Sequence, residues 1–316
     1  MNTSKIGHSD LAVSRINLGG NVFGWTLDEA QSFKILDAFA DKGGNFIDTA
    51  DVYSCWVPAN TGGESETIIG KWLKTRRDKD KLVVATKVGW DFGDGVRKGL
   101  KPAYIKQAAE ASLKRLQVDT IDLYYTHIDT GEVPVEEYLG AYAELIKEGK
   151  VRYIAASNVP ADRLRYSLEL GASGAYPLYQ ALQPHYNLVE RTTYESEYAP
   201  IVAQYGLTVF PYWSLASGFL TGKYRSEADL GKSVRGGGVK KYLDAKGLSV
   251  LAALDEVAEK HHTSVAAAAL AWLLAKPGIG APIASATSPS QLDTLFAATA
   301  LTLDAGDVQA LDKASQ

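Results

Sequence analysis

The sequence predicts a (β/α)8 barrel formed by a single domain that spans residues 1–316. Short apolar runs alternate along the chain with longer segments of helical periodicity, and eight of these runs have the character of core strands. Three of them stop at an ionisable residue, as strands do when their carboxyl ends share one rim of a parallel barrel. The chain is longer than most single domains, but barrels of this size occur as one domain.

The predicted elements alternate between strand and helix through most of the chain. The strands are short and apolar, and we expect them at residues 16–18, 45–48, 82–86, 121–126, 153–157, 181–184, 208–211 and 282–284. The helices have apolar positions three or four residues apart, and we expect them at residues 27–41, 64–76, 102–116, 135–148, 160–170, 195–205, 248–262, 265–274 and 305–313. Before the first strand, residues 4–14 resemble a short β-hairpin that would close the floor of the barrel.

The regular spacing widens after the seventh strand, where residues 225–247 are expected to form a long loop. Three consecutive glycines, Gly236 to Gly238, lie among charged residues there, and such a run disfavours a regular element. Because the loop follows a strand end, it lies at the rim where active sites of such barrels are built. A lid over the site and a tolerated insertion are both consistent with this composition.

The composition narrows the class of protein. The chain is 46% hydrophobic and 22% charged with a formal net charge of -4, which favours a soluble globular protein and argues against nucleic-acid or anionic-membrane partners. The single cysteine, Cys55, excludes an internal disulfide framework and is expected to be a small packed residue. Residues 1–5 lead into no long apolar stretch, and the apolar run 265–275 is too short to span a bilayer. We therefore expect a cytoplasmic protein, of an oligomeric state that the sequence leaves open.

Four polar residues lie at the predicted carboxyl ends of neighbouring strands: Asp48, Tyr53, Lys87 and His127. Because parallel strands end at one rim, we expect these side chains to converge on one site. A phenol, an ammonium, a carboxylate and an imidazole together can deliver a proton to a carbonyl oxygen, which predicts an enzyme acting on a carbonyl or an alcohol. A nearby cation favours the phenolate, so Lys87 is expected to lower the pKa of Tyr53 while Asp48 holds the lysine in place. An N–H of His127 would orient the carbonyl oxygen.

The segments that carry these residues resemble those of the aldo-keto reductases, which are NAD(P)H-dependent (β/α)8-barrel oxidoreductases. The resemblance rests on residues 45–53, 85–87 and 122–127, and it extends over nearly the whole chain. It implies that Tyr53 is the general acid and base and that His127 orients the substrate. It also implies an NADP cofactor, with NAD as the alternative, and a small-molecule carbonyl or alcohol as the substrate.

Two further segments resemble the cofactor-binding parts of that family. Ser157, Asn158 and Gln183 match positions that hydrogen-bond the nicotinamide carboxamide, a group suited to hydroxyl and amide partners. Residues 210–224 resemble the segment that holds the nicotinamide ring and the pyrophosphate. The resemblance implies that Tyr212 stacks on the ring and that the neighbouring contacts come from Trp213, Ser214, Leu215, Ser217 and Lys223. No Gly-x-Gly-x-x-Gly fingerprint follows the first strand, so a Rossmann domain is not supported.

The last matching segment departs from the family pattern. Gln291 keeps the family's glutamine, but Ser285 and Thr287 stand where relatives commonly have glycine and arginine. In relatives that arginine grips the 2′-phosphate of NADP, and threonine cannot reproduce its two-pronged hydrogen bonding. Hydroxyl groups of Ser285, Thr287 and Ser288 at a helix start still offer donors to a phosphate. NADP, NAD or the use of both coenzymes therefore stays open.

Four tryptophans lie in predicted rim loops: Trp25, Trp56, Trp90 and Trp213. Core packing accounts for any one of them, but the group predicts an aromatic-walled substrate pocket for a sugar face or a flat hydrophobic carbonyl. The adjacent histidines at 261–262 lack metal-ligand spacing, and no metal site is expected.

Two other classes of protein are compatible with the motifs. The first is a nucleotide-binding regulatory subunit of the same fold, such as the channel β-subunits of this superfamily, which can retain all four rim residues. The second is a (β/α)8 enzyme whose likeness is architectural only, because a fold does not fix a function. That second class would leave the trio Ser157, Asn158 and Gln183 to chance.

Overall fold

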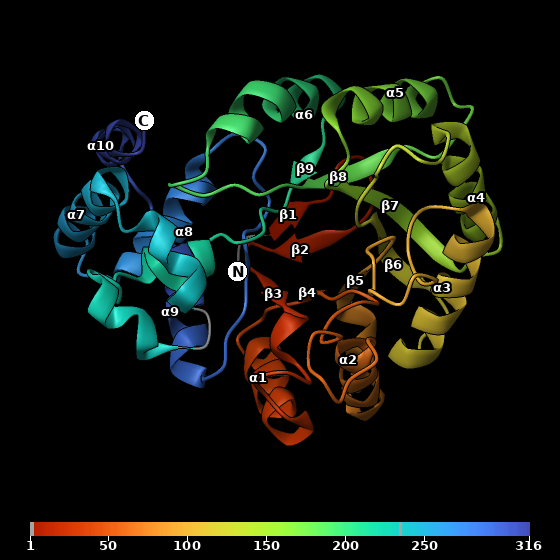
Figure 1. Ribbon diagram of the computed structural model, residues 1–316, viewed down its shortest axis with the longest axis horizontal. Helices are drawn as coiled ribbons and strands as arrows, with labels where there is room; N and C mark the ends of the chain where they lie inside the picture. The colour runs from red at the N-terminus through yellow and green to blue at the C-terminus, as the bar shows by residue number, and fades with distance from the viewer. Residues whose placement is uncertain (1–2, 234–235) are drawn as a thin grey trace.

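Eight parallel strands run around the centre of the molecule in the computed structural model, which describes residues 3–233 and 236–316 (Figure 1). Their order in the sheet is β10-β3-β4-β5-β6-β7-β8-β9. The bounds are β3 (Asn17–Gly19), β4 (Phe46–Asp48), β5 (Val83–Val88), β6 (Ile121–Thr126), β7 (Val151–Ser157), β8 (Tyr179–Gln183), β9 (Thr208–Val209) and β10 (Ile283–Ala284). The eight predicted strands and the (β/α)8 fold are confirmed.

Backbone hydrogen bonds across the last seam bring the two ends of the sheet together. The Ile283 N–H donates to the Pro211 carbonyl (2.9 Å), and the Gly280 N–H donates to the Val209 carbonyl (2.9 Å). Because the strands are parallel and share one direction around the barrel, their carboxyl ends all meet at one face. That face is the one toward the viewer in Figure 1, away from the N-terminal hairpin.

The helices lie outside the strands (Figure 1). Their bounds are α1 (Glu29–Asp41), α2 (Glu64–Thr75), α3 (Pro102–Leu116), α4 (Val135–Lys147), α5 (Ala161–Ala172), α6 (Ala199–Tyr205), α7 (Ala245–Lys260), α8 (Val265–Ala275), α9 (Pro289–Ala300) and α10 (Ala305–Ala314). Helix α1 starts with a capping box, in which Asp28 and Gln31 each accept from the other's backbone N–H. Helix α9 is absent from the predicted helices. Its buried face is only Leu292, Leu295 and Ala298, a narrow apolar stripe that a sequence pattern reveals weakly.

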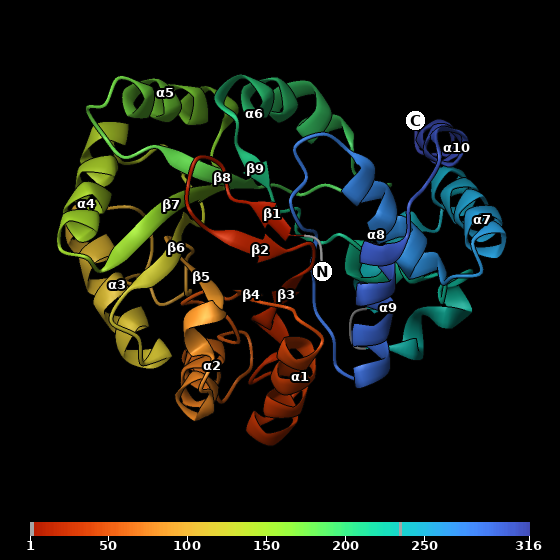
Figure 2. The same cartoon turned by 180° about the vertical axis from the view of Figure 1, so that it is seen from behind.

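A hairpin of β1 (Thr3–Lys5) and β2 (Ala12–Ser14) closes the amino-terminal end of the barrel, as predicted (Figure 2). The turn between the two strands is fixed to the barrel by polar contacts. The Gly7 N–H donates to the Thr208 hydroxyl (2.8 Å), and the His8 N–H donates to the Gln180 side chain (2.8 Å). Solvent access to the barrel centre is therefore left to the opposite face.

The apolar core has two parts. The larger part lies between strands and helices, and the smaller part fills the barrel interior. Phe46 and Phe210 meet edge to face there, with ring centroids 4.9 Å apart. The rest of the interior set is Ile6, Leu11, Val13, Val83, Ala85, Leu123, Tyr125, Ala155, Ala181, Ala281 and Ile283. The interior of the barrel is thus filled by packed side chains and is not an open channel.

The long segment after β9 is more ordered than its glycines predict. The expected long loop is present, but Glu227–Lys232 and Gly236–Tyr242 form short 3-10 helices within it, and α7 already begins at Ala245. The physical reason is that the second 3-10 helix, Gly236–Tyr242, is anchored to the core by its last residue. Tyr242 is buried against Phe219, with ring centroids 5.5 Å apart. Residues 234–235 of the expected loop lie outside the described residues.

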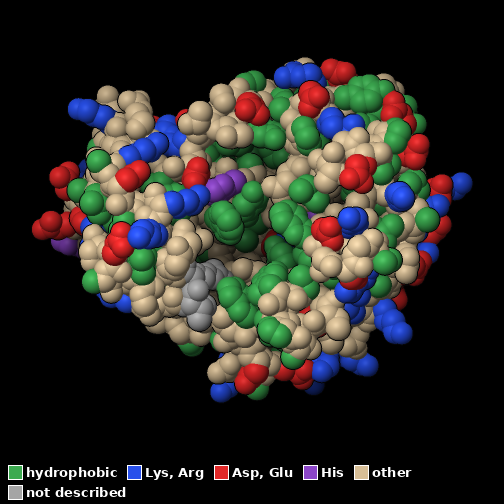
Figure 3. Space-filling model, in the orientation of Figure 1, with side chains coloured by type: hydrophobic (Ala, Val, Ile, Leu, Met, Phe, Trp, Pro, Cys, Tyr) green, Lys and Arg blue, Asp and Glu red, His purple; other side chains and the backbone are tan. Residues whose placement is uncertain are grey.

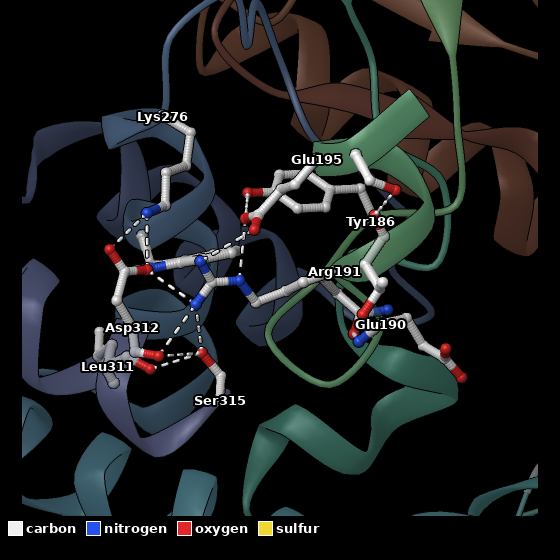
Figure 4. Close-up of polar contacts among 12 residues, drawn as sticks. Tyr186, Glu190, Arg191, Glu195, Lys276, Leu311, Asp312 and Ser315 are labelled. Carbon is white, nitrogen blue, oxygen red and sulfur yellow. Dashed lines mark hydrogen bonds and ion pairs between the residues drawn. The ribbon is translucent and has the colours of Figure 1, made fainter. Parts of the chain in front are cut away.

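A polar network fastens the carboxyl-terminal helix to the segment after β8 (Figure 4). Arg191 donates to Glu195 (2.9 Å) and to the Ser315 hydroxyl (2.7 Å), and it pairs with Asp312 (3.0 Å). Asp312 also accepts from Lys276 (2.6 Å). These partly buried ion pairs share partners, since Asp312 contacts both Arg191 and Lys276. Such networks stabilise a fold more than isolated surface pairs do.

Asp312→Asn is expected to lower the free energy of unfolding by roughly 1.5–3 kcal/mol, because it removes the charge that accepts from Lys276 and pairs with Arg191. Urea unfolding measures the loss. Asp255→Asn provides the matched control, since Asp255 pairs with Arg225 on the exposed surface. That control should cost less than about 1 kcal/mol. Equal losses in the two variants would contradict a structural role for the network.

Candidate active site

The four predicted rim residues come from three neighbouring strands. Asp48 ends β4, Tyr53 lies in the turn that follows, Lys87 is near the end of β5, and His127 directly follows β6. The face that carries them is hollowed at its centre, with hydrophobic side chains gathered around the hollow (Figure 3). The structure brings all four side chains together there.

Lys87 is the centre of the hydrogen-bond network. Its ammonium donates to Asp48 Oδ2 (2.5 Å), to the Thr49 carbonyl (2.8 Å) and to the Tyr53 hydroxyl (3.0 Å). The Tyr53 hydroxyl in turn lies 3.3 Å from Asp48 Oδ2. Lys87 is completely buried, so all three of its N–H donors have protein acceptors and the side chain has one orientation.

Gln183, which was predicted from the sequence to bind the cofactor, also belongs to this hydrogen-bond network. Its amide nitrogen donates to Asp48 Oδ1 (2.8 Å) from the end of β8. Asp48 is therefore held at both carboxylate oxygens, and Gln183 keeps its second amide N–H and its side-chain carbonyl oxygen for other partners.

Electrostatics at the site differ from the expectation for Tyr53. Burial first, and then the Asp48 carboxylate, raise the pKa of Tyr53 well above its ordinary value. Burial also lowers the pKa of Lys87, although Asp48 opposes that shift. The expected lowering of the Tyr53 pKa by Lys87 is thus wrong, because desolvation and an adjacent anion outweigh the cation. The phenol is protonated at neutral pH.

His127 is a neutral imidazole beside the tyrosine. Burial, and then the positive charge of Lys87, hold the pKa of His127 well below its usual range. Its ring centroid lies 6.1 Å from that of Tyr53. Its Nδ1 is buried and has no hydrogen-bond partner among the described residues. A proton on Nε2 avoids an unpaired buried N–H, which makes Nε2 the donor toward the hollow.

The residues predicted to hold a carboxamide form a connected set next to the tetrad. Ser157 donates to the Gln183 carbonyl (2.9 Å), and the Asn158 amide donates to Ser157 (3.0 Å) and to the His127 carbonyl (2.9 Å). The Tyr212 hydroxyl donates to Asn158 Oδ1 (2.9 Å). Amide and hydroxyl groups from three strand ends thus adjoin the acid-base residues.

The segment after β9 has an unusual backbone. Trp213, Ala216 and Ser217 are non-glycine residues with positive φ angles of 51°, 48° and 57°. Such strained conformations cluster at ligand-binding sites. Ser214, also predicted to bind the cofactor, is buried and its hydroxyl donates to the Pro211 carbonyl (2.9 Å). Ser214 therefore stabilises the turn of residues 211–214. Leu215 is partly buried in the same turn, and Lys223 is exposed.

The predicted phosphate-binding residues form a separate cluster at the start of α9. Gln291 Oε1 accepts from the Thr287 N–H (2.8 Å) and the Thr287 hydroxyl (3.2 Å). Ser285 donates to the Asn21 side chain (2.5 Å), which lies after β3. Sequence reasoning missed Asn21, since its only signal was its place directly after the first strand.

Three of the four rim tryptophans share a continuous set of ring contacts with the tetrad. Trp25 packs edge to face on Trp56 (5.5 Å between centroids), and Trp56 contacts Tyr53 (6.2 Å). Trp90 lies 5.0 Å from the His127 ring. Trp56 and Trp90 are 46% and 40% exposed, unusual for such large apolar side chains.

Trp213 belongs to a second aromatic group with His185 and Tyr212. Its ring meets His185 edge to face (5.0 Å), and His185 is stacked on Tyr212 (5.4 Å). Trp213 therefore neighbours the residue predicted to stack on a nicotinamide ring.

Two other features concern the residues that the structure describes. Within 3–233 and 236–316, no helix combines the length and the apolar character needed to cross a membrane. In the same ranges, no three His, Cys, Asp or Glu side chains are grouped so that they could hold a metal ion.

A protein-family model described as "Aldo/keto reductase family" matches residues 15–316. The chain belongs to the aldo/keto reductase family. It is 34% identical to aldo-keto reductase YhdN of Bacillus subtilis, over 97% of this chain and 91% of that protein. It is 29% identical to aldo-keto reductase yakc [NADP(+)] of Schizosaccharomyces pombe, over 99% of this chain and 91% of that protein. A probable voltage-gated potassium channel subunit beta of Arabidopsis thaliana is 30% identical, over 92% of this chain and 89% of that protein.

The resemblance read from the sequence is thus confirmed for the family. The aldo/keto reductases are oxidoreductases, and this chain has the general character of one.

Proposed function

We propose that this aldo/keto reductase reduces a small aldehyde or ketone to the alcohol, or runs the reverse oxidation, with Tyr53 as general acid and base. The observation that carries the proposal is the buried Lys87, which donates to both Asp48 and Tyr53 (2.5 and 3.0 Å). A buried cation paired with a carboxylate is a costly arrangement, and such arrangements cluster at functional sites. NAD(P)H, when bound, supplies a hydride to the carbonyl carbon.

The protein's part is to place and protonate the carbonyl oxygen. The Tyr53 hydroxyl is protonated at neutral pH and releases its proton toward the oxygen as negative charge develops there. Lys87, already within hydrogen-bond distance of that hydroxyl, stabilises the phenolate that remains. His127 is neutral, so its N–H orients the carbonyl without competing as an acid.

The donor set fits an NAD(P) cofactor. Ser157, Asn158 and Gln183 present hydroxyl and amide groups beside Asp48, as a carboxamide needs. The strained turn at Trp213 to Ser217 follows directly from Tyr212, the residue proposed to stack on the ring. The yakc relative is named for NADP(+), which supports NADP, whereas the missing arginine at Thr287 supports use of NAD as well.

The walls of the hollow favour a flat, apolar carbonyl over a sugar, whose hydroxyl groups need polar partners. The exposed rings of Trp56 and Trp90 flank the tetrad on both sides. The nearby carboxylates already have partners within the protein. Asp129 is buried and forms an ion pair with Arg163 (2.7 Å), and Asp91 accepts a hydrogen bond from the Gly93 N–H (2.7 Å). Stacking on tryptophan is thus the main interaction that the rim offers to a substrate.

A regulatory role is the second candidate, and one observation favours it. The chain is 30% identical to a protein named as a probable potassium channel β-subunit. A subunit of this kind would bind NAD(P)H through the same residues and turn over carbonyls slowly or not at all.

Turnover measurements separate the two candidates. Purified protein is mixed with NADPH or NADH and a panel of aromatic, aliphatic and sugar aldehydes, and the nicotinamide absorbance is followed. We expect many turnovers with flat aromatic aldehydes and fewer with sugars. Tight coenzyme binding without turnover for any carbonyl would favour the regulatory subunit.

The raised pKa of Tyr53 sets the expected pH dependence. Reduction requires the protonated phenol, so its rate should be constant through neutral pH and decline only at alkaline pH. Oxidation requires the phenolate, so its rate should increase as the pH rises. Initial rates of both directions across a pH series test this. A reduction rate that falls between pH 6 and 8 would contradict the assignment, because it would place the essential acid near about 7, as for an ordinary histidine.

A further inference from the structure

A second tyrosine lies beside Lys87 inside the barrel. Tyr125 of β6 is the register partner of Lys87 of β5, so the two side chains leave neighbouring strands at one level. Both point into the barrel, because Ala85, two residues before Lys87, belongs with Tyr125 to the interior cluster. Tyr125 is 0% exposed, and the proposed reaction does not use it.

The neighbouring strands leave room for its ring. Tyr125 pairs with Ala155 of β7, and Ala181 of β8 is in the same interior cluster. Larger side chains at these positions would occupy the space that the ring fills. The ring centroid consequently lies 5.7 Å from Lys87 Nζ, and the Tyr53 centroid lies 4.7 Å from the same atom. Both distances are within the roughly 6 Å range of cation–π attraction.

The hydroxyl of Tyr125 does not explain why a tyrosine is buried at this position. It is buried and makes no hydrogen bond of regular geometry to a described residue, although the Gln183 amide lies close enough to oppose the rise of its pKa. An unpaired buried hydroxyl destabilises a fold, so it is the ring that makes the favourable contribution. The ring faces a fully buried ammonium, where loss of water makes an aromatic quadrupole most valuable.

We propose that Tyr125 is a positioning residue for Lys87: its aromatic face stabilises the buried ammonium and keeps it hydrogen-bonded to Asp48 and Tyr53. The inference rests on the proposed function of Lys87 at this site. Among the described residues, Asp48 is the carboxylate that hydrogen-bonds the ammonium, and burial still lowers the pKa of Lys87.

Three variants of the full-length protein separate the ring from the hydroxyl. Tyr125→Phe keeps the ring, whereas Tyr125→Leu and Tyr125→Met replace it with apolar groups that have no quadrupole. Methionine fills irregular gaps, so it retains packing if leucine leaves too large a cavity. The Lys87 ammonium is titrated by NMR with carbon-13 lysine, and its signal is assigned by its loss in Lys87→Met.

We expect Tyr125→Phe to leave the pKa of Lys87 unchanged and the leucine and methionine variants to lower it by about one unit. The pH profile of turnover should shift in the latter two variants only. An unchanged lysine pKa in both aliphatic variants, or an equal fall in the phenylalanine variant, would overturn the inference.

The titration needs neither coenzyme nor substrate, so the two proposals fail separately. A wild-type protein that reduces no carbonyl refutes the proposed function, yet its lysine pKa still responds to the ring. A normal reductase whose lysine pKa ignores the ring refutes only the role of Tyr125.

Discussion

Replacing Tyr53 with phenylalanine is expected to lower turnover by about 10²–10⁴-fold while coenzyme binding survives. The variant keeps the ring that contacts Trp56 and removes only the hydroxyl that lies 3.0 Å from Lys87. Lys87 retains Asp48 and the Thr49 carbonyl as acceptors, so the site should keep its shape. Steady-state rates with the best aldehyde of the panel and coenzyme fluorescence titration measure the two effects.

The control for this substitution is Tyr166→Phe, which removes a hydroxyl from an exposed tyrosine on α5 whose partner is Glu136 and not a residue of the tetrad. It should leave turnover unchanged. If Tyr53→Phe kept near-normal turnover, Tyr53 would not be the acid, and the proton would have to come from His127 or from solvent.

Thr287→Arg is expected to tighten NADPH binding by roughly 1.5–3 kcal/mol, the range for a hydrogen bond to a charged group. NADH lacks the 2′-phosphate and should gain little. The guanidinium would replace a short hydroxyl that is now held by Gln291 Oε1 (3.2 Å). The backbone N–H of residue 287 donates to the same oxygen (2.8 Å) and should keep the turn intact.

Dissociation constants for both coenzymes test this prediction. Thr302→Arg adds the same charge to the exposed segment after α9 and controls for long-range attraction. A gain shared equally by NADPH and NADH, or matched by Thr302→Arg, would mean that Thr287 does not face the 2′-position.

The barrel was predictable from sequence because its signals are local. Each strand is a short apolar run, and the rim residues Asp48, Lys87 and His127 lie at or directly after the ends of such runs. Parallel topology then forces these strand ends onto one face. The same reasoning failed at α9, whose buried stripe is narrow, and at Gly236–Tyr242, where burial of Tyr242 outweighs the glycines.

The parts of the site that sequence did not reveal depend on contacts between distant residues. Gln183 bonds Asp48 across 135 positions, and Ser285 bonds Asn21 across 264 positions. No local pattern records such pairs. The direction of the Tyr53 pKa was also out of reach, because it depends on how deeply the phenol is buried and how near Asp48 lies.

Transfer of label from the coenzyme tests the central claim most directly. The protein is incubated with an aromatic aldehyde and with NADPH or NADH that carries deuterium in place of both hydrogens at C4 of the nicotinamide ring. The proposed function predicts an alcohol with deuterium on its carbinol carbon from the wild-type protein and almost none from Tyr53→Phe. Coenzyme oxidation without deuterium in the alcohol, or equal labelling by the two proteins, would contradict it.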